Sequence, residues 1–222
     1  MRRVNIIFWN IDTLNDFVEP SGKLYVPGTE TIKEVLGKLT QLAKSKSIRV
    51  VNSCDYHSIH SAEISDNPDY IHTFPQHCIA GTPGANFIVE TTPEDPVIFD
   101  YDKKYVINRD FHNLLLKERN FMIRKDDFDV FKGNPITEEI VKILDPDIIV
   151  AYGVYTNVCV DYVVSGLANR GYKVYVIEDA IKELPDIPLP FDSWKLKGVE
   201  MISYHELEKY LSAFNSTKKS RK

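Results

Sequence analysis

The segment 147–153 is the most constraining feature of this sequence. It holds the apolar run Ile148-Ile149-Val150-Ala151 and ends at a glycine. A continuous run of β-branched residues, without alternation of polar and apolar side chains, indicates a strand that is buried on both faces. Such strands are typical of parallel sheets in α/β proteins, because helices cover both faces of those sheets.

Other segments predict further strands, and helical patterns separate them. The expected strands cover 4–11, 49–53, 120–124 and 173–177, and the expected helices cover 31–45, 137–144, 158–170 and 206–214. This alternation predicts an α/β fold with one doubly wound, mostly parallel sheet and helices on both faces. We expect a single domain over residues 1–214 and a basic, frayed tail over 215–222.

The charge balance and the cysteine count narrow the class of protein. The chain has 27 lysines and arginines against 32 aspartates and glutamates, which argues against a nucleic-acid partner. No apolar run approaches the length of a membrane-spanning helix, so we expect no membrane partner. Three widely separated cysteines fit a reducing compartment better than a disulfide framework, which predicts a cytoplasmic protein.

Chemically useful side chains follow several of the predicted strands. Asp12 follows the first, Asp55 and His57 follow the second, and Lys125 follows 120–124. The strand at 147–153 leads into Cys159. Because α/β folds place their sites at the carboxyl ends of parallel strands, we expect these side chains to form one site.

Cys159 lies in the first turn of a predicted helix, where the helix dipole favours a thiolate. Free backbone N–H groups in the preceding turn suit a developing oxyanion. The alternative is a buried, inert cysteine, which is the interpretation we give to Cys54 and Cys78. Asp12 would serve as the base, although a capping role is an alternative for it and for Asp16.

Lys125 would stabilise the charged states of this cysteine and its base, and a solvated surface lysine is the alternative interpretation. A cluster of potential metal ligands lies nearby in the sequence. Four of the six histidines fall between residues 57 and 77, and Asp55-Tyr56-His57 places two ligand types on alternate residues. Such a set suits Zn²⁺, Fe²⁺ or Mn²⁺.

Three motifs in series resemble those of one enzyme family. Residues 11–17 (Ile-Asp-Thr-Leu-Asn-Asp-Phe) are similar to its opening Asp-x-Gln-x-Asp-Phe. Residues 74–84 (Phe-Pro-Gln-His-Cys-Ile-Ala-Gly-Thr-Pro-Gly) are similar to Trp/Phe-Pro-x-His-Cys-x-x-Gly-Thr-x-Gly. Residues 153–160 (Gly-Val-Tyr-Thr-Asn-Val-Cys-Val) are similar to Gly-Val-x-Thr-(Asp/Asn)-x-Cys-Val. The chain therefore resembles the nicotinamidase branch of the isochorismatase-like cysteine hydrolases.

The resemblance implies an amidohydrolase that converts nicotinamide and water to nicotinate and ammonia, a reaction of NAD salvage. It implies that Cys159 is the nucleophile, that Asp12 is its base and that Lys125 is the third catalytic residue. It also implies a cis peptide bond between Val154 and Tyr155, which would turn the amides of Tyr155 and Cys159 toward the oxyanion.

The resemblance further implies a bound divalent metal, with Zn²⁺ expected and Fe²⁺ or Mn²⁺ as alternatives. Its ligands would be Asp55, His57 and His77, and it would contact the pyridine nitrogen of the substrate. The family's second histidine after Asp-x-His has no clean equivalent here. His60 is the nearest candidate, and the alternatives are Glu63, Asp69 and His72.

Phe17 and Phe74 would enclose the substrate ring, and Leu14 replaces the usual glutamine. Tyr155, where many members carry alanine, would reshape the pocket. An isochorismatase-like hydrolase for another small amide or carbamoyl compound is therefore the alternative function. A non-catalytic ligand-binding domain is disfavoured by the complete set of Asp12, Lys125 and Cys159. Relatives are often oligomeric, so a homo-oligomer is an open alternative.

Overall fold

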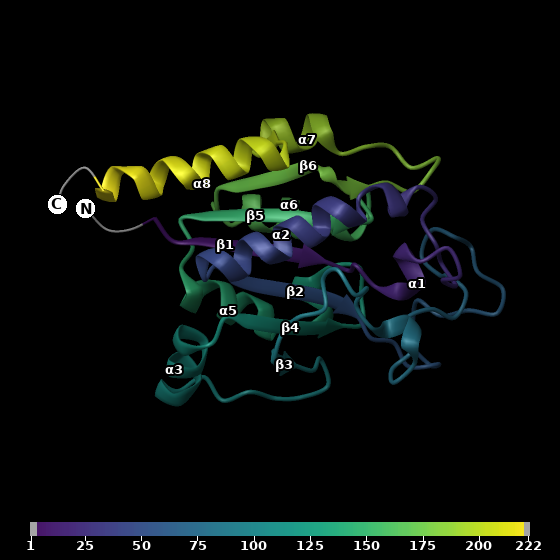
Figure 1. Ribbon diagram of the computed structural model, residues 1–222. Helices are drawn as coiled ribbons and strands as arrows, with labels where there is room; N and C mark the ends of the chain where they lie inside the picture. The colour runs from purple at the N-terminus through teal and green to yellow at the C-terminus, as the bar shows by residue number, and fades with distance from the viewer. Residues whose placement is uncertain (1–3, 220–222) are drawn as a thin grey trace.

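The computed structural model describes residues 4–219 and contains one seven-stranded sheet (Figure 1). Every neighbouring pair of strands is parallel, and the order across the sheet is β3-β4-β2-β1-β5-β6-β7. The strands are β1 (Ile6–Ile11), β2 (Arg49–Asp55), β3 (Val97–Phe99), β4 (Asn120–Lys125), β5 (Ile148–Val154), β6 (Val174–Lys182) and β7 (Glu200–Ile202). The predicted α/β fold with a doubly wound parallel sheet is confirmed.

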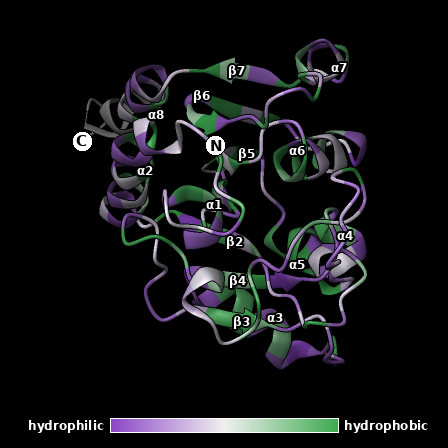
Figure 2. Ribbon diagram, turned by 90° about the vertical axis from the view of Figure 1, so that its right-hand side faces the viewer, coloured by the Kyte–Doolittle hydropathy of each residue, from purple (hydrophilic) through white to green (hydrophobic). Residues whose placement is uncertain are grey.

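Helices cover both faces of this sheet (Figure 2). α2 and α8 lie on one side, whereas α4, α5 and α6 lie on the other. The helices are α1 (Asn15–Val18), α2 (Lys33–Lys46), α3 (Arg109–Lys117), α4 (Val130–Gly133), α5 (Ile136–Leu144), α6 (Cys159–Asn169), α7 (Phe191–Leu196) and α8 (Tyr204–Lys219), with 3₁₀ turns at Thr29–Thr31 and Pro83–Ala85. No helix among residues 4–219 is long and apolar enough to cross a membrane.

The core lies between the sheet and its helices, and the sequence pattern explains its position. All seven residues of β5 are buried, as the unbroken apolar run predicts. α2 buries Leu36, Leu39, Leu42 and Ala43, which recur at helical spacing on one face. Each large apolar side chain removed from water stabilises the fold by roughly 1.5–3 kcal/mol.

Several elements differ from the prediction. Helices α1, α4 and α7 and strands β3 and β7 were not predicted, because each is too short to show a periodic pattern. Helix α3 was also not predicted, although it is amphipathic and buries Phe111 and Leu115. β6 extends beyond the predicted end at residue 177, after a register shift between Ala151 and Gly153. α8 runs to Lys219, past the predicted end at residue 214, and residues 220–222 lie outside the described residues. The division into a domain and a tail at residue 214 stays a prediction.

The strand order brings separate parts of the chain to one edge of the sheet. β1 lies at the centre, with β2 and β4 on one side and β5 on the other. The connections from β1 to β2 and from β4 to β5 therefore run in opposite directions across the sheet. Where such connections diverge, beside β1, a crevice forms at the carboxyl ends of the strands. Asp12, Asp55, Lys125 and the turn that leads to Cys159 all reach this edge.

Candidate active site

Lys125 is a buried cation at the centre of the site. The parallel pairing of β2 with β4 places it directly opposite Asp55, and its ammonium group donates a hydrogen bond to Asp55 Oδ1. Lys125 Nζ also lies 3.0 Å from Asp12 Oδ2 and 3.7 Å from Cys159 Sγ. The two carboxylates hold the pKa of Lys125 well above its ordinary value, although burial opposes the charge. The predicted catalytic residues therefore meet around one permanent positive charge.

Asp12 follows β1 directly and is fully buried. Its φ of 50° lies in the left-handed region, which is uncommon for a residue other than glycine, and its amide donates to the Ser53 carbonyl. Burial raises the pKa of Asp12 to about 6, because Lys125 only partly offsets the loss of water and Asp55 adds a second negative charge. A carboxyl group with a pKa in this range can both accept and return a proton near neutral pH.

Cys159 is the first residue of α6 and is buried beside Lys125. Burial raises the pKa of the thiol well above its ordinary value, although Lys125 opposes the shift. The resting group is therefore a thiol, which differs from our expectation that the helix terminus would favour a thiolate. The physical reason is that loss of water disfavours the anion more than the local charges favour it. This thiol needs a base, and Asp12 is in position to serve.

The turn before Cys159 depends on a close approach of β5 to β1. Gly153 has a φ of 132°, and a Cβ atom there would lie 2.0 Å from the Ile11 carbonyl oxygen, so only glycine fits. The peptide bond between Val154 and Tyr155 is cis, as the resemblance implied. The amides of Val158 and Val160 both donate to the Tyr155 carbonyl, which closes the turn.

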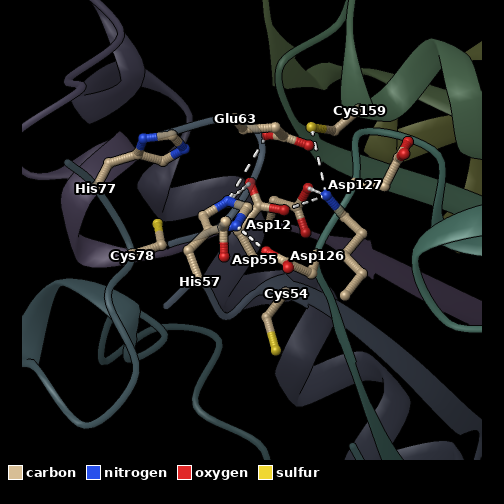
Figure 3. Close-up of polar contacts among 12 residues, drawn as sticks. Asp12, Cys54, Asp55, His57, Glu63, His77, Cys78, Asp126, Asp127 and Cys159 are labelled. Atoms are coloured by element: carbon tan, nitrogen blue, oxygen red, sulfur yellow. Dashed lines mark hydrogen bonds and ion pairs between the residues drawn. The ribbon is translucent and has the colours of Figure 1, made fainter. Parts of the chain in front are cut away.

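A second group of side chains adjoins the first and has the composition of a metal site (Figure 3). Ligand atoms of Asp55, His57 and His77 all lie within 4.8 Å of one another, and all three residues are buried. His57 Nδ1 lies 2.6 Å from Asp126 Oδ1, and His77 Nδ1 lies 2.7 Å from the Pro75 carbonyl oxygen. Because both partners only accept, each Nδ1 carries the hydrogen when its ring is neutral, and each Nε2 has a free lone pair.

Unpartnered buried atoms test whether this group fits a metal ion. His57 Nε2 and both carboxylate oxygens of Glu63 are buried without a hydrogen-bond partner. Nε2 lies 3.7 Å from Glu63 Oε2 and 3.8 Å from Asp55 Oδ2. Buried polar groups are normally satisfied, so these atoms fit a site that binds a cation. Two imidazoles and carboxylates match the ligand preferences of Zn²⁺ and related ions.

The charges in this group favour a cation. Burial raises the pKa of Glu63 to about 7, and the charge on Asp55 adds to that shift. Burial opposes the charged form of His57, yet its contacts with Asp126, Asp55 and Glu63 outweigh burial and raise its pKa to about 10. The three acids around His57 therefore favour a positive charge at the place where a metal ion would bind.

The structure brings Glu63 to this group and leaves His60 outside it. His60 lies exposed in a turn, and His72 and Asp69 are exposed in the following loop. The Asp69 carboxylate instead accepts hydrogen bonds from the amides of its own turn. Glu63 is buried because the Phe74 amide donates to its carbonyl and Ile64 pairs with Phe74.

Aromatic rings border His77. The Phe17 ring centroid lies 5.5 Å from that of His77 and 4.9 Å from that of Tyr155, and Phe74 lies 6.2 Å from His77. The Tyr155 hydroxyl donates to the Leu24 carbonyl at 2.6 Å, which fixes this ring. Phe17 and Phe74, which we predicted to bind the substrate ring, therefore border the group of Asp55, His57 and His77. We call these three residues the metal-like group.

Two further residues at the site were not predicted as functional. Asp126 contacts His57, and the Phe128 ring lies 5.9 Å from that of Phe74. Both residues follow Lys125 closely in the chain, and this position was the only feature of the sequence that could have indicated a role at the site. Asp16, for which a capping role was the expectation, accepts from the Cys78 and Lys23 amides, with its carboxylate packed against Gly84.

Known proteins share parts of this sequence and its fold. Residues 108–188, which include Lys125 and Cys159, match the model of the isochorismatase domain. Over this segment the chain is similar to the isochorismatase family. The predicted resemblance to this family is confirmed.

Two nicotinamidases are among the proteins to which the chain is similar. The chain is 36% identical over 78 residues to the nicotinamidase/pyrazinamidase of Mycobacterium tuberculosis, a match that covers 35% of this chain and 40% of that enzyme. It is 24% identical to the nicotinamidase of Saccharomyces cerevisiae, over 80% of this chain and 88% of that enzyme. The fold matches a pyrazinamidase of Pyrococcus horikoshii in complex with zinc, with a TM-score of 0.68, 21% identity, and coverage of 90% of this chain and 99% of that one.

Proposed function

We propose that this protein is a cytoplasmic nicotinamidase of NAD salvage, which hydrolyses nicotinamide to nicotinate and ammonia. The observation that carries the proposal is the buried set of Asp12, Lys125 and Cys159. Lys125 in this set also contacts Asp55, which belongs to the metal-like group. The two nicotinamidases among its relatives support the choice of substrate. The enzyme class follows from a nucleophile, a base and a buried cation within contact distance of one another.

The first half-reaction uses Asp12 to move one proton. The Asp12 carboxylate accepts the proton of the Cys159 thiol, and Sγ attacks the carboxamide carbon. The backbone N–H groups of Tyr155 and Cys159 stabilise the resulting oxyanion, and such donors typically contribute about 3–4 kcal/mol each. Asp12 then gives its proton to the departing nitrogen, so ammonia leaves and a thioester remains on Cys159. Lys125 stabilises the negative charge as it passes between Asp12 and Cys159.

The second half-reaction releases nicotinate. Asp12 accepts a proton from a water molecule, whose oxygen attacks the thioester carbon and displaces the Cys159 sulfur. The proton held by Asp12 then returns to the sulfur, which restores the resting thiol. Asp12 thus serves both steps, which is why a pKa near neutrality suits it.

The metal would be held by Asp55, His57 and His77, with Glu63 in place of His60 as the fourth ligand. When bound, it would orient the substrate through the pyridine nitrogen, and Zn²⁺ is the ion that we propose. Phe17 and Phe74, whose rings border His77, would hold the pyridine ring between them.

A second candidate function is the hydrolysis of another small amide or carbamoyl compound. The observation that favours it is the position of Tyr155, which is 4% exposed and packs on Phe17 beside Cys159. A fixed aromatic ring at this point limits the length and shape of the acyl group that reaches the nucleophile. Substrate preference is therefore the part of the proposal that needs a direct assay.

Ammonia release from nicotinamide by the purified protein tests the proposal. We expect release by the zinc-loaded protein, loss of release after the metal is removed with a chelator, and recovery after Zn²⁺ is returned. Circular dichroism of each sample controls for unfolding. A folded, zinc-loaded protein that releases no ammonia from nicotinamide, but does so from another small amide, would instead establish the second candidate function.

The pH dependence of turnover follows from the raised pKa of Asp12. Because the carboxylate form is the base, kcat/KM is expected to fall below about pH 6, by up to about tenfold per pH unit. An unperturbed aspartate, with a pKa of about 3.9, would keep turnover constant to about pH 5. Rates measured between about pH 4.5 and about pH 8, with folding checked at each pH, separate these outcomes. A flat profile down to pH 5 contradicts the raised pKa of Asp12, because it is the profile of an unperturbed aspartate.

A further inference from the structure

We propose that Asp126 is a positioning residue for the metal site, because its carboxylate holds His57 by Nδ1 and directs Nε2 toward Asp55 and Glu63. The inference rests on the proposed function, since it concerns the metal site of the same enzyme. Asp126 itself lies too far along the chain from the Asp55-Tyr56-His57 segment for the sequence to connect them.

The end of β4 supports the Asp55–His57 segment at two points. Lys125, the last residue of β4, binds the Asp55 carboxylate, and its carbonyl accepts from the Tyr56 amide at 3.0 Å. The next residue, Asp126, lies 2.6 Å from His57 Nδ1. Consecutive residues of β4 and its following turn therefore hold two of the metal ligands. The catalytic cation and the proposed positioning carboxylate come from one short segment.

The two histidines of the site are held in chemically different ways. His77 Nδ1 is held by a neutral carbonyl group, that of Pro75, whereas His57 Nδ1 is held by a carboxylate. A carboxylate that accepts from one imidazole nitrogen makes the other nitrogen a stronger electron-pair donor. The His57 side chain is fully buried, so its ring has no water to replace this contact. Asp126 thus sets both the orientation and the donor strength of His57.

A purely structural role for Asp126 is the competing explanation, and its neighbour provides a matched control. Asp127 carries the same charge on the same turn, but its carboxylate pairs with Lys132 and accepts from the Asp129 amide at 3.0 Å. Loss of one negative charge from this turn is therefore common to Asp126→Asn and Asp127→Asn. Only the first substitution changes a contact with a metal ligand.

The test is the affinity of the full-length, metal-free protein for Zn²⁺, measured by competition with a chromophoric chelator. We expect Asp126→Asn, which keeps a neutral acceptor, to weaken binding by about tenfold, and Asp126→Ala to weaken it by up to about 100-fold. Asp127→Asn should retain the affinity of the unmodified protein, and His57→Ala sets the lower limit. The absorption spectrum of bound Co²⁺ should change in the Asp126 variants and stay unchanged in Asp127→Asn.

The outcomes separate this inference from the proposed function. If the unmodified protein binds no Zn²⁺, the proposed metal site itself is wrong. If it binds Zn²⁺ and both Asp126 variants bind equally well, the positioning role is overturned. Equal weakening by Asp126→Asn and Asp127→Asn also overturns it, because the effect then comes from the charge of the turn alone. Should Asp126→Ala fail to fold, Asp126→Asn decides the question, since it preserves the shape of the side chain.

Discussion

Cys159→Ala is expected to lower the turnover of nicotinamide by about 10⁴–10⁶-fold, the range seen when an enzyme loses its nucleophile. Without Sγ no thioester forms, and neither Asp12 nor Lys125 can replace it as a nucleophile, because Asp12 is already paired with the Lys125 ammonium. The metal-like group has no ligand from Cys159, so zinc content should stay the same. The measurement is ammonia release per bound zinc ion.

Cys54→Ala is the matched control for this prediction. Cys54 is also a buried thiol, but its sulfur contacts the Ile123 carbonyl, at 3.7 Å. The control variant should therefore retain turnover and lose at most some stability from the small cavity left by the sulfur. If Cys159→Ala retains more than a small fraction of the original turnover, the thioester mechanism is wrong.

Lys125→Met is expected to destabilise the protein as well as inactivate it. The substitution keeps most of the volume of the side chain but leaves Asp12 and Asp55 buried without their shared cation. Removing one partner of a buried ion pair typically costs about 3–5 kcal/mol of the free energy of unfolding. It also raises the pKa of Asp12 further, because Lys125 is the charge that opposes burial, and a protonated Asp12 cannot act as a base.

Urea-induced unfolding of Lys125→Met measures the first effect, and ammonia release measures the second. The double variant Lys125→Met with Asp12→Asn should regain part of the stability, since one unpaired carboxylate is gone, but none of the activity. Lys132→Met, which removes an exposed lysine paired with Asp127, should change the free energy of unfolding by no more than about 0.5 kcal/mol. An unchanged unfolding midpoint in Lys125→Met contradicts the role that we assign to this buried cation.

The strands and the residues at their ends could be predicted from the sequence, because both depend on local pattern. The apolar run of β5 and the helical spacing in α2 are properties of short segments, and parallel pairing then brings the strand ends to one edge. For that reason Asp12, Lys125 and Cys159 meet in the structure as the sequence indicated. Their catalytic roles stay proposals until the variants are assayed.

The loop between β2 and the second family motif could not be predicted in the same way. His60 and Glu63 lie close together in the sequence, and ligand chemistry alone favours the histidine. The structure buries Glu63 and exposes His60, because the pairing of Ile64 with Phe74 sets the path of the loop. A loop without periodicity carries no sequence signal for which of its side chains turns inward.

The sequence by itself therefore determined the parallel α/β sheet, the resemblance to the isochorismatase family and the residues that reach the carboxyl edge of the sheet. Only the tertiary structure decided that Glu63 joins the metal-like group, that Asp126 holds His57, and that Tyr155 packs on Phe17. The physical reason is the range of the interactions involved. Strand and helix patterns arise from neighbouring residues, whereas the contacts of Asp126 with His57 and of Tyr155 with Phe17 join segments far apart in the chain. The position of Glu63 depends on the path of an irregular loop, which the pairing of Ile64 with Phe74 sets.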